Sequence, residues 1–238
     1  MTTSLSLSHV SKSIGKTTIL DDISFSVNRG EVFGFIGANG AGKTTTLKII
    51  LGILQPNCGE VTLFGKSPRE QEIQKKIGFM PEHTYFYKFL TGEEFLDYSA
   101  SFYRVPHDIL EKRKGDLLKK VGLFDARKKR LSTYSKGMLQ RIGIAQAIIH
   151  DPEIIFLDEP MSGLDPLGRV MIKDILQELK KQGKTIFFNS HILSDVEVLC
   201  DRFAIIHKGK ILTQMPVSEL NNSLEDFFLE TVKGANIK

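Results

Sequence analysis

The feature that most constrains the fold of this chain is a glycine-rich segment between a strand-like run and a helix-like run. Residues 32–36 are apolar, as in a buried parallel strand, and residues 43–54 carry apolar side chains at helical spacing. Residues 37–45, which join these two runs, read GANGAGKTT and have the spacing of a phosphate-binding loop. Glycines let backbone N–H groups wrap phosphates at a helix N-terminus. We therefore predict a nucleoside triphosphate site made of Gly37, Asn39, Gly40, Ala41, Gly42, Lys43, Thr44 and Thr45.

Two side chains of this segment have defined tasks in such a loop. Lys43 is expected to reach the β- and γ-phosphates, and the Thr44 hydroxyl is expected to bind Mg²⁺. The alternative is a helix-capping turn that happens to be rich in glycine. The strand before the loop and the helix after it favour the phosphate site.

A pair of carboxylates follows a second apolar run. Residues 154–157 are hydrophobic and lead into Asp158, Glu159 and Pro160. Ligands of open α/β sheets bind at the carboxyl ends of the strands, so this pair is expected beside the phosphates. Asp158 suits the Mg²⁺ shell, and Glu159 suits positioning or deprotonating the attacking water. The alternative is a strand end with solvated acids, which the phosphate loop upstream makes the weaker interpretation.

The periodicity along the chain predicts an α/β protein. Alternating apolar and polar residues before residue 65 indicate antiparallel strands, and strand-like runs after residue 150 alternate with a helix over 167–181. Between them the pattern is helical over 93–103, 108–121 and 137–149. We predict a phosphate-loop core with a mixed sheet and an N-terminal antiparallel β subdomain over 1–84 and 150–238. A helical subdomain is predicted to be inserted over 85–149.

Composition sets limits on the location and the partners. The net charge is +4, which is too weak to indicate a nucleic-acid partner. The two cysteines lie far apart and no secretory leader pattern precedes Val10, so we expect a reducing cytosolic setting. No apolar run reaches the roughly 18 residues of a membrane span, so we do not expect this chain to cross a bilayer by itself. Basic residues gather within 112–130. They form either a solvated helical face or a contact for anionic lipid or an acidic partner.

The order of further segments resembles an ATP-binding-cassette (ABC) ATPase over nearly the whole chain. The segments 77–82, 135–141 and 154–160 are followed by 162–165 and His191. The resemblance implies a single ABC ATPase domain over 1–238, with ATP and Mg²⁺ as cofactors.

In that family, two cassettes hold two ATP molecules between them. The resemblance implies that Ser135 and Gly137 contact the γ-phosphate across the dimer. It also implies that His191 touches the γ-phosphate and that Asp165 belongs to the loop that couples the two sites. The predicted catalytic residues are therefore Glu159, His191 and Lys43.

Three positions depart from the family pattern. Residues 134–138 read YSKGM, where Leu-Ser-Gly-Gly-Gln is usual, but the serine and the second glycine are kept. Glu82 stands where glutamine is common, and its carboxylate can still bind Mg²⁺. Ile14 stands where the family stacks an aromatic ring on adenine. The predicted metal ligands are thus Thr44, Asp158 and Glu82, with Ile14 at the nucleotide.

Lys136, Met138, Glu82 and the tail at 223–228 resemble the ABC-2 type of exporter. This implies an ATP-hydrolysing subunit at the cytoplasmic face of the cell membrane. Its partners would be a separate transmembrane permease and a second ABC ATPase subunit, identical or different, with no nucleic acid.

Two other functions are open to a chain with a phosphate loop. A soluble ABC ATPase acting on nucleic acid or ribosomes generally has two cassettes or a long coiled-coil insertion, and this chain has one cassette without sustained heptads. A small-molecule kinase with a phosphate loop would not need the paired carboxylates together with the family's signature segment, which is YSKGM at residues 134–138 here.

Overall fold

The computed structural model describes residues 2–82 and 86–236, which belong to two compact units. The first unit combines Met1–Gln74 with Gly183–Lys238, and the second unit is Lys75–Gln182. The subdomain boundaries at residues 85 and 149 stay a prediction.

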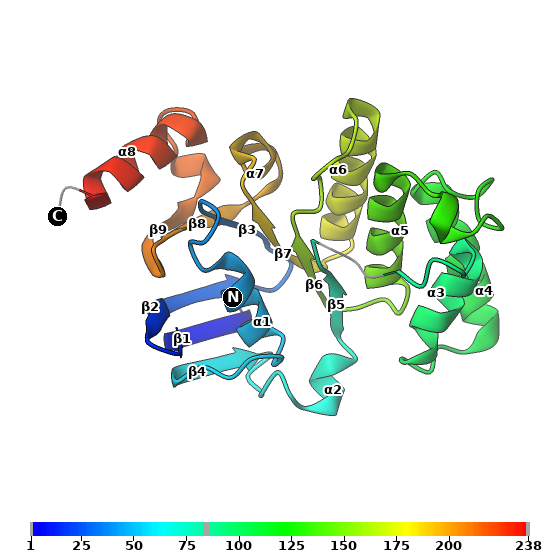
Figure 1. Ribbon diagram of the computed structural model, residues 1–238, viewed down its shortest axis with the longest axis horizontal. Helices are drawn as coiled ribbons and strands as arrows, with labels where there is room; N and C mark the ends of the chain where they lie inside the picture. Colours follow the sequence, from blue (N-terminus) through cyan, green and yellow to red (C-terminus); the bar gives the residue numbers. More distant parts are fainter. Residues whose placement is uncertain (1, 83–85, 237–238) are drawn as a thin grey trace. The chain divides into compact units, whose positions relative to one another are not determined.

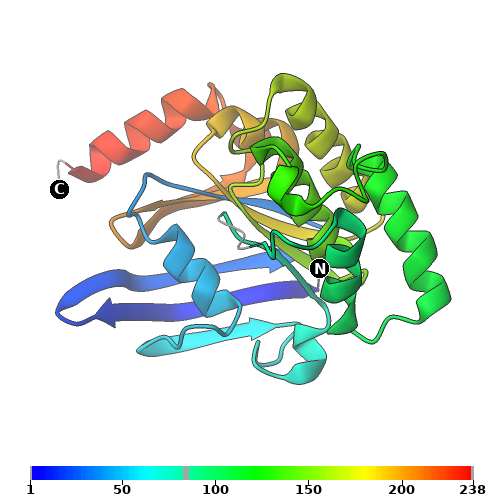
Figure 2. The ribbon, with the colours of Figure 1, turned by 45° about the vertical axis from the view of Figure 1, so that its right-hand side comes forward.

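The first unit begins with an antiparallel sheet. Strands β1 (Thr3–Ile14), β2 (Thr17–Asn28) and β4 (Cys58–Leu63) lie in the order β2-β1-β4 (Figures 1 and 2). Leu5 and Leu7 are buried, because alternate residues of a strand point to opposite faces and these two face the core. The predicted N-terminal antiparallel strands are confirmed.

A second sheet of the first unit carries the glycine loop. In it, β7 (Thr185–Ser190), β3 (Val32–Ile36) and β8 (Arg202–His207) are parallel neighbours, with β3 in the middle. A hairpin adds the antiparallel strand β9 (Lys210–Pro216) beside β8, so the sheet is mixed as predicted. Every residue of β3 and β7 is buried, as expected for strands covered on both faces. The helices of this unit are α1 (Lys43–Ile50), α2 (Gln71–Gln74), α7 (Leu193–Leu199) and α8 (Leu224–Asn236), with the 3₁₀ turn η2 (Val217–Glu219).

Four phenylalanines fill the core of the first unit. Phe25 of β2, Phe33 and Phe35 of β3 and Phe187 of β7 have ring centroids 5.3–6.1 Å apart. Aromatic pairs at such separations stabilise a fold beyond the area that they bury. This cluster fixes the antiparallel sheet against the strand that precedes the glycine loop.

We expect Phe187→Leu to lower the free energy of unfolding by about 1–3 kcal/mol, because three ring contacts are lost and a small void remains. Urea denaturation followed by circular dichroism measures the change. Ile53→Val is the control, since Ile53 is 64% exposed and should change little. Equal stability of the two variants would contradict the role of the cluster.

The second unit pairs β5 (Ile77–Met80) in parallel with β6 (Ile154–Asp158). Three of its helices pack side by side, namely α3 (Gly92–Ser101), α4 (His107–Lys120) and α5 (Lys136–Ile148) (Figure 1). The predicted helices of this region are confirmed to within a few residues. The unit also contains α6 (Pro166–Lys181) and the 3₁₀ turn η1 (Leu131–Thr133).

One lysine in the basic stretch of α4 is not solvated. The Nζ of Lys114 donates to Asp97 Oδ1 at 2.6 Å and to Glu111 Oε1 at 2.7 Å, and its side chain is 11% exposed. Burial lowers the pKa of Lys114, but the two carboxylates raise it by more, so that the net direction is upward. Lys114 therefore joins α4 to α3, and it is not part of a solvated basic face.

Within residues 2–82 and 86–236, no helix has both the length and the apolar character needed to span a membrane.

Candidate functional site

The glycine loop lies between β3 and α1 in the first unit, with its tip exposed. Ala38, Asn39, Gly40 and Thr44 are exposed, and Thr45 is half-buried. Lys43 is 7% exposed. Its Nζ donates to the carbonyl oxygens of Gly37 at 2.6 Å and Ala38 at 3.3 Å. The loop thus closes around the ammonium group of Lys43, and the phosphate contacts of Lys43 stay a prediction.

Two glycines of the loop cannot be replaced without movement of their neighbours. A Cβ at Gly37 would overlap the carbonyl oxygen of Ile206 in β8. Gly42 has φ +113°, and a Cβ there would lie 2.6 Å from the Leu20 side chain. The neighbouring strands therefore fix the shape of the loop.

Helix α1 points its N-terminus at the same loop. It begins at Lys43 with Gly42 as its N-cap, and its first turn contains no acidic residue. The first N–H groups of a helix have no partner inside the helix, and the helix dipole adds positive charge there. This end of α1 is therefore suited to an anion.

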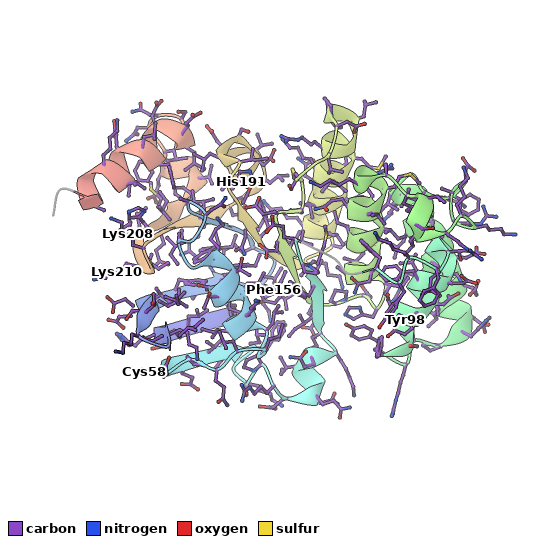
Figure 3. The ribbon with its side chains drawn as sticks, in the orientation of Figure 1. Cys58, Tyr98, Phe156, His191, Lys208 and Lys210 are labelled. Carbon is purple, nitrogen blue, oxygen red and sulfur yellow. The ribbon has the colours of Figure 1, made fainter. Side chains whose placement is uncertain are left out.

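Two more predicted residues lie in the first unit. Ile36 of β3 pairs with Ser190 of β7, so His191, which follows β7, lies at the same sheet edge as the loop (Figure 3). His191 is exposed. Ile14 is 58% exposed at the end of β1. The unit thus brings His191 to the edge where phosphates would bind, and it leaves the Ile14 side chain accessible.

The paired carboxylates end β6 in the second unit. Asp158 is 5% exposed and Glu159 is 6% exposed, so they are not the solvated strand-end acids of the alternative interpretation. Glu159 has φ +51°, in the left-handed region. Non-glycine residues held there are found preferentially at functional sites.

A residue that sequence reasoning missed holds this turn in place. The amide nitrogen of Gln140, on α5, donates to the carbonyl oxygens of Glu159 at 3.0 Å and Pro160 at 3.1 Å. Gln140 is 8% exposed. The only signal in the sequence was a polar residue on the buried face of a predicted helix.

The signature segment forms the start of α5. The Ser135 Oγ accepts a hydrogen bond from the N–H of Met138 at 3.2 Å and so caps the helix. A hydroxyl can accept one hydrogen bond and still donate another, so capping leaves the Ser135 O–H able to donate to a phosphate. Tyr134 is buried, its hydroxyl donates to the Ala126 carbonyl at 2.9 Å, and burial raises its pKa. Gly137 is half-buried at the first turn.

Lys136 lies against the segment that follows the carboxylates. The end of its side chain packs on Gly163, where a Cβ would lie 2.8 Å from Nζ. Two residues further on, Asp165 caps α6 by accepting a hydrogen bond from the Gly168 N–H at 2.7 Å. The signature segment and the segment at 162–165 are therefore in contact within the second unit.

The predicted metal ligands supply oxygen atoms only. Thr44 belongs to the first unit, Asp158 and Glu82 belong to the second, and Glu82 is exposed next to residues 83–85, which lie outside the described residues. Across the described part of the chain, no three His, Cys, Asp or Glu side chains gather into a metal site. A hydroxyl and one or two carboxylates fit Mg²⁺, which takes its other ligands from phosphates and water.

Known proteins of similar sequence are ATP-binding proteins. Residues 20–162 match a family model described as ABC transporter. An uncharacterized ABC transporter ATP-binding protein of Synechocystis sp. is 50% identical over 89% of this chain. This chain spans 60% of the length of that relative. The bacitracin transport ATP-binding protein BcrA of Bacillus licheniformis is 38% identical over 92% of this chain and 72% of its own length.

A solved structure has the same fold. The ATP-binding subunit of an ABC transporter superposes with a TM-score of 0.90 at 30% identity, covering 96% of this chain and 99% of the other. The predicted fold class is confirmed.

Proposed function

Because the chain belongs to the ATP-binding subunits of ABC transporters, we propose that it hydrolyses ATP with Mg²⁺ and thereby drives a membrane exporter. The predicted family membership is confirmed. The observation that carries the proposal is the phosphate loop at the end of β3, closed around Lys43. The similarity to a bacitracin transport ATP-binding protein supports a role in transport.

Nucleotide binding uses groups that the loop already holds in place. Lys43 exchanges the carbonyls of Gly37 and Ala38 for oxygens of the β- and γ-phosphates, which are stronger partners for an ammonium group because they are charged. The N–H groups at the start of α1 bind the same phosphates. Thr44, Asp158 and Glu82 would supply oxygen ligands to Mg²⁺, which when bound neutralises phosphate charge.

Glu159 acts on the water that attacks the γ-phosphate. Its carboxylate orients the water and accepts its proton, and Gln140 keeps the backbone of the turn in place. His191 contacts the γ-phosphate from the end of β7. The burial of Glu159 supports this role, since a general base acts best when it is held in one position.

A second ABC ATPase subunit completes each site. Ser135, Gly137 and the N-terminus of α5 contact the γ-phosphate of the ATP that the other subunit binds. ATP therefore favours the closed dimer, because only that state contacts the nucleotide from both sides. Hydrolysis removes this preference, and the dimer reopens.

The docking surface for the permease is an exposed aromatic ladder on the second unit. The rings of Phe89, Tyr87, Tyr98 and Phe102 follow one another with centroids 5.8, 5.2 and 5.1 Å apart, and Tyr98 is labelled in Figure 3. Their exposed fractions are 68%, 47%, 40% and 66% in the same order. Contiguous exposed apolar side chains are typical of interaction sites, and aromatic residues dominate the energy of many interfaces. An amphipathic cytoplasmic helix of the permease fits this surface and brings the chain to the cytoplasmic face of the membrane.

Co-purification from detergent-solubilised native membranes tests the proposal. We expect a tagged chain to bring down a protein with several membrane spans in stoichiometric amount. Recovery only in the soluble fraction, with ribosomes or nucleic acid attached, would contradict the exporter.

We expect Phe102→Ser to reduce the permease recovered in that experiment by about tenfold or more, since an interface aromatic commonly contributes about 2 kcal/mol. ATP hydrolysis by the isolated chain should not change, because Phe102 lies outside the nucleotide site. Leu167→Ser is the matched control, as Leu167 is 80% exposed on α6. Equal recovery of permease with both variants would rule out the aromatic ladder.

A further inference from the structure

The first unit has a hollow that the proposed ATPase function does not use. It lies near the N-terminal end of β1 and has a volume of about 640 Å³. Small-molecule sites are commonly about 300–1,000 Å³ in volume. Its lining includes the hydroxyl residues Ser4, Ser6, Ser26 and Thr62, together with Arg29 and Phe64.

The floor of the hollow is a row of hydroxyl groups across three strands. In the register of the sheet, Ser6 of β1 is directly opposite Ser26 of β2 on one side and Thr62 of β4 on the other. Side chains that are opposite each other on neighbouring strands are about 4.5–5.5 Å apart, and each hydroxyl can both donate and accept. The row therefore matches a ligand that carries several hydroxyl groups.

The floor is held in place at one end by buried hydrogen bonds. Ser4 is fully buried, and its Oγ lies 3.1 Å from Thr185 Oγ1 of β7. The same Thr185 oxygen accepts a hydrogen bond from the Gly30 N–H at 3.0 Å. These contacts fix the start of β1 beside the turn that carries Arg29.

An arginine and an aromatic ring form the wall. The Arg29 guanidinium lies over the ring of Phe64, 5.1 Å from its centroid. Backbone hydrogen bonds tie both residues to the start of the chain, from Arg29 N–H to the Thr2 carbonyl at 2.9 Å and from Phe64 N–H to the Ser4 carbonyl at 2.8 Å. No Asp or Glu occurs among the described residues that line the hollow. The wall is therefore suited to an anion.

We propose that this hollow binds a small phosphorylated, hydroxyl-rich molecule of the sugar phosphate class. Arg29 binds the phosphate as a charged donor, and the row formed by Ser26, Ser6 and Thr62 binds the sugar hydroxyls. The ring of Phe64 packs on the apolar face of the sugar. The hollow is distinct from the phosphate loop, because Arg29 precedes β3 whereas the loop follows it, and five strand residues span about 17 Å.

Glucose 6-phosphate is the probe, and isothermal titration calorimetry measures its binding. Saturating MgADP is present, so that the phosphate loop is occupied. We expect saturable binding, weakened about tenfold or more in Arg29→Gln and about fivefold in Thr62→Val, because each variant removes ligand hydrogen bonds. Glucose and inorganic phosphate should each bind more weakly than glucose 6-phosphate.

Lys233→Gln is the matched control, since it removes the same charge from an exposed position of α8. It should bind the probe like the unchanged chain. Absence of saturable binding would overturn the proposal. So would equal affinity in Arg29→Gln, Thr62→Val and the control, with all three folded by their melting temperatures. Neither result bears on ATP hydrolysis, so failure here is distinguishable from failure of the proposed function.

Discussion

Glu159→Gln is expected to lower the rate of ATP hydrolysis by about 100- to 10,000-fold and to leave ATP binding intact. Glutamine has the size of glutamate but cannot accept a proton from water. The hydrogen bonds from Gln140 go to the backbone carbonyls of residues 159 and 160, so the turn should keep its shape. Phosphate release measures turnover, and a fluorescent ATP analogue measures binding.

Glu153→Gln provides the control for this change. Glu153 lies shortly before the same strand, where it pairs with Lys76 at 2.7 Å, and its side chain is 41% exposed. We expect this variant to turn over at the ordinary rate. An unchanged rate in Glu159→Gln would remove Glu159 from the mechanism, whereas lost binding would show that the substitution disturbs the site as a whole.

Lys43→Ala is expected to weaken ATP binding by about 100-fold or more. Each hydrogen bond from a charged donor is worth about 1.5–3 kcal/mol, and Lys43 serves two phosphates in the proposed site. A filter-binding assay with labelled ATP measures the loss. If Lys43→Ala binds ATP with ordinary affinity, the phosphate site is elsewhere.

Two further variants separate the loss of charge from damage to the loop. Lys48→Ala removes an exposed lysine from the same helix and should bind ATP normally. Lys43→Ala also loses the bonds to Gly37 and Ala38, so its melting temperature must be compared with that of the unchanged chain. Lys43→Arg keeps the charge and should recover part of the affinity.

The features that could be predicted from the sequence are those with a local signal. The glycine spacing identified the loop, the uniform apolar runs identified β3 and β6, and the 3.6-residue period identified the long helices. These patterns depend on residues close together in the chain. They can therefore be recognised in the sequence without any knowledge of tertiary contacts.

The features that were missed depend on contacts between distant segments. Gln140 donates hydrogen bonds to carbonyls 19 and 20 residues away. The periodicity of the sequence does not indicate which buried polar side chain makes such a contact. Lys114 belongs to a basic run for which the sequence favours a solvated face. In the structure its side chain is buried, because it pairs with Asp97, 17 residues earlier. The aromatic ladder likewise depends on tertiary packing, because it joins Phe89 and Tyr87 to Tyr98 and Phe102 of a later segment.

The hydrogen bonds of Gln140 have a mechanical consequence for the proposed dimer. In that dimer, α5 would present its N-terminus to the partner's nucleotide. A little over one turn further along, Gln140 of the same helix holds the backbone of Glu159. In the proposed dimer, α5 would therefore connect the nucleotide bound by one subunit to the turn that carries Glu159 of the other.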